Sequence, residues 1–143
     1  MKKKLTVILS LALLLPILLL SGCTKANPLP DSMDQDQVSA VAQQIVNELV
    51  AGEYQSVADR FRDDMKNAYS VTAQTVEAMM GTVTKAGPYV ATERVLVLGG
   101  DKKIQNEDYA TALVYCKHEE KAIVYEMSLD INLELLGLAA NQK

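Results

Sequence analysis

Residues 86–98, with the sequence AGPYVATERVLVL, mark the point at which the chain changes from one kind of regular structure to another. Gly87 and Pro88 predict the end of a helix, because glycine permits the left-handed turn that closes a helix and proline cannot continue it. From Tyr89 to Leu98 the chain is rich in β-branched and aromatic residues, which is typical of a strand. Helices are therefore expected before this stretch and strands after it.

Three helices are predicted before the glycine–proline pair. The first has apolar residues that recur at the 3.6-residue spacing of one helix face: Val38, Val41, Ala42, Ile45, Val46, Leu49 and Val50. Ser32 with Gln35, or Asp34 with Gln37, offers N-cap chemistry. Gly52 can close the end of this helix.

The second helix begins near Glu53 and repeats the same spacing with Tyr54, Val57, Ala58, Phe61 and Met65. Its other face carries Asp59, Arg62, Asp63 and Lys66. We interpret that face as solvated, with local ion pairs that contribute a few tenths of a kcal/mol each. The pattern breaks near Ser70, and Ser70 or Thr72 can cap a third helix that ends at Gly87.

After the first strand, the sequence predicts further strands joined by turns. The predicted elements are a long strand over 104–117, a polar hairpin connection over 117–121, a partner strand over 122–129, an alternating segment over 131–138, and a tail over 139–143 that we expect to fray. Helices followed by consecutive antiparallel strands define an α+β domain, with three helices packed on a curved sheet of about four strands.

The N-terminus has the layout of a bacterial lipoprotein signal. Three lysines precede an apolar run of about 16 residues, which is short of the roughly 20 needed to span a bilayer. The run ends in Leu20-Ser21-Gly22-Cys23, a lipobox pattern in which Cys23 receives the lipid and becomes the new N-terminus. An uncleaved transmembrane helix is the alternative. We therefore expect a signal peptide over 1–22, a lipidated cysteine and tether over 23–33, and a single domain over 34–140, held by lipid on the extracytoplasmic face of the cell membrane.

Charge and cysteine content exclude several classes of protein. The chain has 14 basic and 18 acidic residues, and three of the basic ones lie in the signal. An acidic surface argues against nucleic acid as a partner and against docking on anionic lipid by charge. With Cys23 committed to lipid, Cys116 has no partner for a disulfide, and we expect it to be a small buried side chain.

A family resemblance rests on several of these features together. They are the sequence ELVAGEY over 48–54, then Phe61 and Met65, then the stop at Gly87, and finally strand 122–129 with Leu136-Gly137-Leu138 after it. In these features the chain resembles the domain of unknown function 3887 family, which occurs in lipoproteins and secreted proteins, mostly of Gram-positive bacteria. The resemblance implies a nuclear transport factor 2-like, or cystatin-like, fold: a helix-lined cone on a curved sheet. It implies no catalytic residues, and by analogy it implies a homodimer through the sheet.

Neither catalytic residues nor a metal or cofactor site are predicted. The one histidine, His118, lies in the charged hairpin connection and is expected to face solvent. One histidine and one free cysteine cannot build a zinc site. Enzymes of the wider fold need a carboxylate inside the apolar cone, so a buried, unpaired Asp59, Glu93 or Glu126 would favour an enzyme.

Four tyrosines on the predicted strands are the candidate ligand-binding residues: Tyr89, Tyr109, Tyr115 and Tyr125. Inside an apolar cone they would give a pocket with polar groups. If the hairpin centres near Glu120, Tyr115 and Tyr125 face each other across it. The alternative is that these tyrosines are core and edge residues of a small sheet.

The sequence therefore favours a membrane-anchored, non-enzymatic binding module for a small apolar ligand or a partner protein. Two alternatives stay open. One is an enzyme or envelope accessory that acts on apolar small molecules inside the cone. The other is an inhibitor or regulator of a surface enzyme, which would present an exposed apolar patch.

Overall fold

The computed structural model describes residues 26–101 and 103–143, so the predicted signal peptide and Cys23 lie outside the described residues. The elements are α1 (Gln35–Val50), α2 (Tyr54–Asp59), α3 (Asp63–Tyr69), α4 (Ala73–Met79), the single turn α5 (Gly81–Thr84), β1 (Tyr89–Gly99), β2 (Ala110–His118), β3 (Ala122–Leu129) and β4 (Leu135–Gln142). This order confirms the α+β class. Within the described ranges, none of the helices has the length and apolar character needed to cross a membrane.

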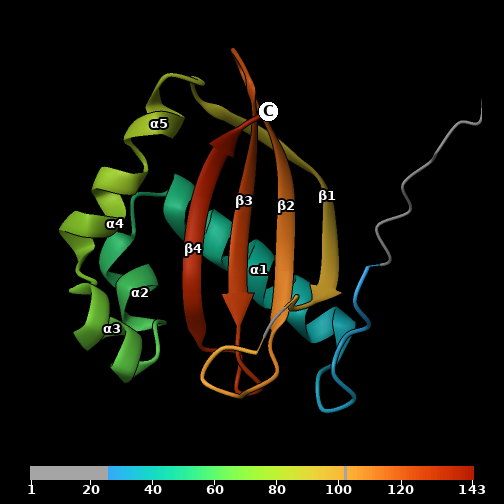
Figure 1. The fold of residues 1–143 in the computed structure, drawn as a ribbon. Coiled ribbons are helices and arrows are strands. Elements are labelled where there is room, and N and C mark those ends of the chain that lie inside the picture. Colours follow the sequence, from blue (N-terminus) through green and yellow to red (C-terminus); the bar gives the residue numbers. More distant parts are fainter. Residues whose placement is uncertain (1–25, 102) are drawn as a thin grey trace, which may run out of the picture.

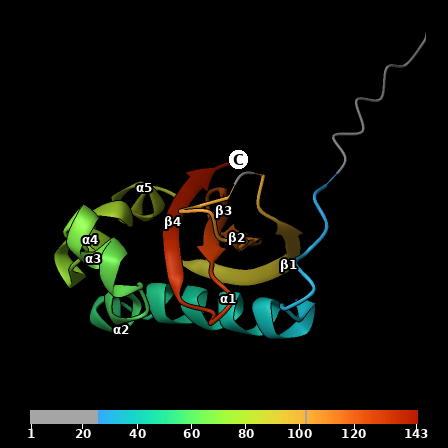
Figure 2. The same cartoon turned by 60° about the horizontal axis from the view of Figure 1, so that its bottom comes forward.

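The four strands form one antiparallel, curved sheet in the order β1-β2-β3-β4 (Figure 1). α1 packs against β1, β2 and β3 on one face of the sheet. The shorter helices stack beside the β4 edge, where α5 contacts β4 (Figure 2). In the part of the chain that is described, no helix covers the other face of the sheet.

The core lies between α1 and the inner face of the sheet. Its largest fully buried side chains include Ile45, Leu49, Val114, Ile123, Tyr125, Met127 and Leu129. The expected cap of α1 is confirmed, because the Asp34 carboxylate accepts a hydrogen bond from the Gln37 backbone N–H at 2.9 Å. Gly52 follows the helix with φ of 77°, as expected for a glycine that closes a helix end.

The prediction of one helix from Glu53 to near Ser70 is wrong, because the chain is extended between α2 and α3. The Arg62 N–H donates to the Leu135 carbonyl at 3.0 Å, and the Leu135 N–H donates to the Arg60 carbonyl at 2.8 Å. Phe61 therefore pairs with Leu135 as a short parallel bridge at the β4 edge. The Arg60 and Phe61 N–H groups still donate to the Val57 and Ala58 carbonyls at 3.2 Å each, and the Arg62 N–H is the first to bond β4 instead.

The third predicted helix is also two segments, α4 and α5. The Thr72 cap is confirmed as a capping box, in which the Thr72 and Thr75 side chains each bond the other's backbone N–H. The helical region ends at Gly87, which has φ of 77°. The predicted stop at the glycine–proline pair is thus confirmed.

The bounds of β2 and β4 differ from the prediction. Residues 104–109 do not extend β2, because Gln105 and Asn106 have φ of 50° and 64° and form a tight turn. The segment after β3 is likewise a turn, in which the buried Asp130 side chain accepts from the Asn132 and Glu134 N–H groups at 2.9 Å each. The tail that was expected to fray belongs to β4 and pairs with β3 up to Gln142.

The register of the central hairpin sets which side chains share a face. Tyr115 pairs with Val124, and Tyr125 pairs with Val114. The expectation that Tyr115 and Tyr125 face each other is therefore wrong. A register shift of one residue moves a side chain to the opposite face of a sheet, so the two tyrosines point away from each other.

Candidate functional site

The structure separates the four candidate tyrosines. Tyr125 is fully buried on the inner face of β3, and Tyr89 lies half-buried at the start of β1. Tyr109 lies with its ring against Gly100 in the loop before β2. Tyr115 lies on the open face of the sheet, with the Arg94 guanidinium 3.9 Å from its ring centre. Only Tyr89 and Tyr125 belong to one neighbourhood.

That neighbourhood borders a hollow of about 310 Å³, which we call the His118 pocket. Its lining residues come from the ends of α1 and α5, the start of β1 and the end of β2. Its lining combines aliphatic side chains with a few polar groups: Leu49, Val50, Tyr54, Met80, Val83, Thr84, Gly87, Pro88, Tyr89 and His118.

His118 is only 3% exposed, so the prediction that it faces solvent is wrong. Its Nδ1 lies 2.8 Å from the Gly87 carbonyl oxygen, which can only accept, so Nδ1 carries the proton. In the neutral ring Nε2 then accepts from the Tyr125 hydroxyl at 3.2 Å. Burial raises the pKa of Tyr125, which keeps that hydroxyl a donor. Both ring nitrogens are satisfied inside the protein, which is why the histidine tolerates burial.

A second set of polar groups leads inward from the pocket. The Tyr89 ring packs edge-on against His118, with ring centres 5.7 Å apart. Its hydroxyl lies 3.0 Å from the Thr92 hydroxyl, and Thr92 Oγ1 lies 3.5 Å from Cys116 Sγ. Each of these three groups can donate or accept. The Tyr89 and Thr92 hydroxyls can therefore exchange donor and acceptor roles.

Cys116 is the inner end of this chain of polar groups. It is a free, buried cysteine, as expected from the sequence. Burial raises the pKa of its thiol, with a smaller opposing effect from the Thr92 hydrogen bond. A thiol that is held in its neutral form is a poor nucleophile.

The lining of the His118 pocket contains no carboxylate and no lysine or arginine. The three acids that could have marked an enzyme, Asp59, Glu93 and Glu126, are all exposed. Among the described residues, no group of three or more histidine, cysteine, aspartate or glutamate side chains is placed to hold a metal ion. The lining therefore offers apolar contact and hydrogen-bonding groups but no charged side chain.

A second hollow of about 320 Å³ lies between α3, α4 and the start of β4, and we call it the β4 groove. Its lining is mostly apolar: Phe61, Tyr69, Val71, Thr75, Val76, Met79, Leu136, Gly137 and Leu138. Tyr69 is 72% exposed at its rim. No buried polar side chain points to a particular ligand here, in contrast to the His118 pocket.

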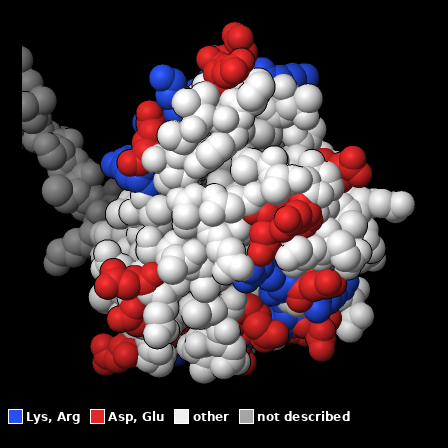
Figure 3. All heavy atoms as spheres, turned by 180° about the vertical axis from the view of Figure 1, so that it is seen from behind, with Lys and Arg blue, Asp and Glu red and all other residues white. Residues whose placement is uncertain are grey.

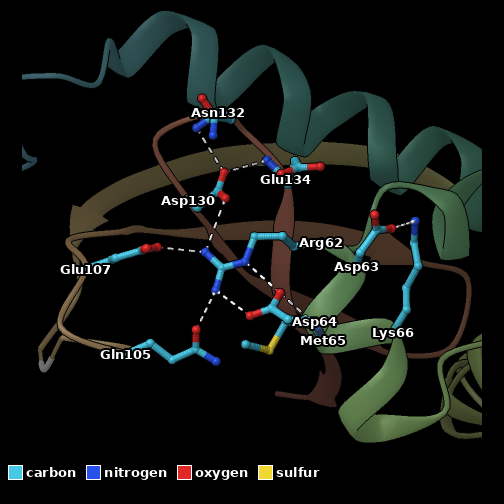
Figure 4. Close-up of polar contacts among 10 residues, drawn as sticks. All are labelled: Arg62, Asp63, Asp64, Met65, Lys66, Gln105, Glu107, Asp130, Asn132 and Glu134. Atoms are coloured by element: carbon cyan, nitrogen blue, oxygen red, sulfur yellow. Dashed lines mark hydrogen bonds and ion pairs between the residues drawn. The ribbon is translucent and has the colours of Figure 1, made fainter.

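The charged residues of α2 and α3 do more than line a solvated helix face. Arg62 forms two hydrogen bonds with the Asp64 carboxylate, at 2.7 and 2.8 Å, and holds the pKa of Asp64 down to about 2 (Figure 4). Its guanidinium also donates to Glu107 at 2.7 Å, to Gln105 at 3.1 Å and to Asp130 at 3.4 Å. This cluster ties the 104–107 turn to the turn after β3, which is a structural role.

Arg60 likewise bridges distant parts of the chain. Its Nε and Nη2 donate to the two oxygens of Glu48 at 2.8 and 2.6 Å. These bonds lower the pKa of Glu48 below its ordinary value, against the opposing effect of burial. Seen from the α1 side, basic side chains lie in small groups beside acidic ones (Figure 3).

The part that His118 plays in this site was not predicted. The signal was present in the strand alternation: Ala110, Ala112, Val114, Cys116 and His118 are two residues apart, and all are buried. The strand was predicted to end at residue 117. If it is extended by one residue to His118, the alternation of side chains predicts that the histidine lies on the inner face.

The fold thus defines a class of small α+β proteins with an open curved sheet and a pocket at one end. The chain belongs to the family described as protein of unknown function (DUF3887), whose model matches residues 42–138. The NMR structure of a protein from Ruminococcus gnavus ATCC 29149 is similar, with a TM-score of 0.66 and 22% identity over 80% of this chain and 96% of that chain. At that identity the likeness concerns the fold alone. Among curated proteins, none matches the sequence.

Proposed function

We propose that this protein is a membrane-anchored, non-enzymatic binding module that holds a small apolar ligand in the His118 pocket. The observation that carries the proposal is the pocket itself, a hollow whose lining combines aliphatic side chains with the polar groups of Thr84, Tyr89 and His118. Ligand sites are typically built in this way. The volume of about 310 Å³ suits a small molecule.

The chemistry of the lining indicates what that ligand would be. Leu49, Val50, Met80 and Val83 supply aliphatic contact. A charged ligand would lose its hydration without gaining an ion pair, which is costly. A neutral molecule that has both an apolar body and hydrogen-bonding groups fits this lining best.

The enzyme alternative lacks a group to carry the chemistry. Proton abstraction from carbon needs a base within hydrogen-bond reach of the substrate. Both nitrogens of His118 are engaged by Gly87 and Tyr125, and the pocket lining holds no carboxylate. A binding role needs no such group.

The membrane anchor is the second part of the proposal. It is supported by the basic n-region, the short apolar run and the lipobox that ends at Cys23. Diacylglycerol on this cysteine would hold the protein on the extracytoplasmic face of the membrane. Metabolic labelling with palmitate tests it: the native chain should take up label, and Cys23→Ala should not.

The proposal also includes a nuclear transport factor 2-like cone with a second copy paired on its open sheet face. Support comes from the apolar side chains on that face, among them Leu96, which is 38% exposed, and Leu113 opposite it on β2. Light scattering tests this part. A dimer that Leu96→Asp converts to a monomer supports it, and a native monomer contradicts it.

Native mass spectrometry of the protein released from bacterial membranes tests the binding function. A retained, neutral small molecule is the expected result. A ligand-free protein under conditions that keep it folded would contradict the proposal and turn attention to protein partners.

A further inference from the structure

Residues 27–33, which we call the strap, lie against the domain. The Gly99 N–H donates to the Asn27 carbonyl at 3.0 Å. The Asn27 side-chain amide donates to the Gly100 carbonyl at 3.1 Å and to the Asp101 carboxylate at 3.0 Å. The strap therefore joins the domain at the end of β1.

Packing supports these hydrogen bonds. Leu29 packs against the core, and Met33 is a core residue with 8% exposure. Gly99 lies so close to the strap that a Cβ at this position would collide with the Pro28 carbonyl oxygen. Close approach of one backbone to another is a recurring reason for glycine in a strand.

Three residues of sequence stand between Cys23 and Asn27, where the strap begins. If Cys23 carries the proposed lipid anchor, this short spacing limits how far the strap can lie from the bilayer. Four residue steps separate Cys23 from Asn27, and a fully extended chain spans at most about 3.6 Å per step, or about 14 Å. The Gly99 end of β1 must then stay within about that distance of the anchored cysteine.

The His118 pocket lies at the other end of the same strand. Tyr89 begins β1 and lines the pocket, and Gly99 ends β1 where the strap joins (Figure 1). A strand rises about 3.3 Å per residue, so the ten steps between these two residues span about 33 Å. This length of β1 is more than twice the longest distance, about 14 Å, that the four steps from Cys23 to Asn27 can bridge.

We propose that the strap holds the Gly99–Asp101 end of the domain toward the bilayer, so that the His118 pocket opens away from it. The membrane-facing surface is formed by the strap and by Asp101 and Lys103, both exposed. The partner of that surface is the lipid headgroup layer. The pocket then receives its ligand from the aqueous side.

Short-range quenching tests this orientation in the full-length lipoprotein, reconstituted in phosphatidylcholine vesicles that carry headgroup nitroxides. A fluorophore is placed on Lys103→Cys at the strap end or on Glu120→Cys beside Gly87 at the pocket end. Cys116 is 1% exposed and should not react, which labelling of the native chain checks. Quenching at position 103 but not at position 120 is the expected result.

Equal quenching at both positions, stronger quenching at 120, or none at either in vesicle-bound protein overturns the orientation. Asn27→Ala, which removes two strap hydrogen bonds, should reduce the difference between the positions, as should Gly99→Ala. If the difference in quenching between positions 103 and 120 is unchanged in both variants, the strap does not set the orientation. Flotation with the vesicles is scored separately, so a failed lipid anchor appears as loss of flotation and is not mistaken for a failed orientation.

Discussion

His118 and Tyr125 meet between β2 and β3, where the tyrosine hydroxyl lies 3.2 Å from the imidazole Nε2. The opposite ring nitrogen bonds the Gly87 carbonyl at 2.8 Å, at the junction of the helices and the sheet. The histidine thus links the central hairpin to the point where the chain enters β1. This link fixes one wall of the His118 pocket.

Replacing Tyr125 with phenylalanine should destabilise the protein by about 1–3 kcal/mol, because His118 Nε2 would be buried without a donor. Urea denaturation measures the loss. Tyr115→Phe, on the open sheet face, is the matched control and should change stability by less than about 0.5 kcal/mol. Equal effects of the two substitutions would show that the hydrogen bond to the histidine contributes nothing.

Glu48→Gln should lower stability at neutral pH by about 1–3 kcal/mol, because it weakens a charge-assisted pair whose carboxylate side chain is 10% exposed. The pKa of Glu48 is lowered in the folded protein from an ordinary value of 4.5, so its stabilising effect is fully present above that value. It is lost as pH falls through the folded-state pKa.

The stability difference between the native chain and Glu48→Gln should therefore be constant near neutral pH and shrink below about pH 4.5. Denaturation series at several pH values measure this. Glu126→Gln, at an exposed position on β3, is the control. A stability difference between the native chain and Glu48→Gln that grows as pH falls would contradict the lowered pKa of Glu48.

Arg62→Lys should cost about 1–2 kcal/mol and loosen two turns at once, because lysine keeps the charge but lacks the guanidinium fork. Hydrogen exchange should become faster over residues 104–107 and 130–134. Arg94→Lys removes a guanidinium from the open sheet face and should leave both turns unchanged. Faster exchange in only one of them would mean that Arg62 does not couple the two.

The parts of the fold that were predictable are those in which local pattern and tertiary packing agree. α1 has its cap, its apolar face and its closing glycine in the sequence, and the structure has all three. The same holds for Gly87 and for β3, whose bounds are the ones expected.

The errors arose where distant contacts override a local pattern. Phe61 fits the helical spacing of its neighbours, yet its backbone pairs with Leu135, which is 74 positions away in the chain. The sequence pattern contains no signal for that pairing. Asp130 stands between the predicted segments 122–129 and 131–138, and its carboxylate accepts from two backbone N–H groups and from Arg62.

The site was harder to predict than the fold. His118 stands among glutamates and lysines, which is typical of a solvent-exposed hairpin connection. Only the alternation of buried residues along β2, continued to its last residue, indicates that His118 lies on the inner face of the sheet. Of the four candidate tyrosines, only Tyr89 lines the pocket, whereas Tyr125 is fully buried and contacts His118. A one-residue difference in the hairpin register places Tyr115 on the opposite face of the sheet from Tyr125. The β-sheet alternation alone could not show which tyrosines share a cavity with the helices.

The most direct test of the central claim compares two pocket-filling variants by native mass spectrometry. Val50→Trp fills the His118 pocket, and Met79→Trp fills the β4 groove; both positions are half-buried and line hollows of similar volume. The proposal predicts that the native chain and Met79→Trp retain a small molecule and that Val50→Trp loses it. Retention by Val50→Trp with loss from Met79→Trp would contradict the proposal and place the ligand in the β4 groove.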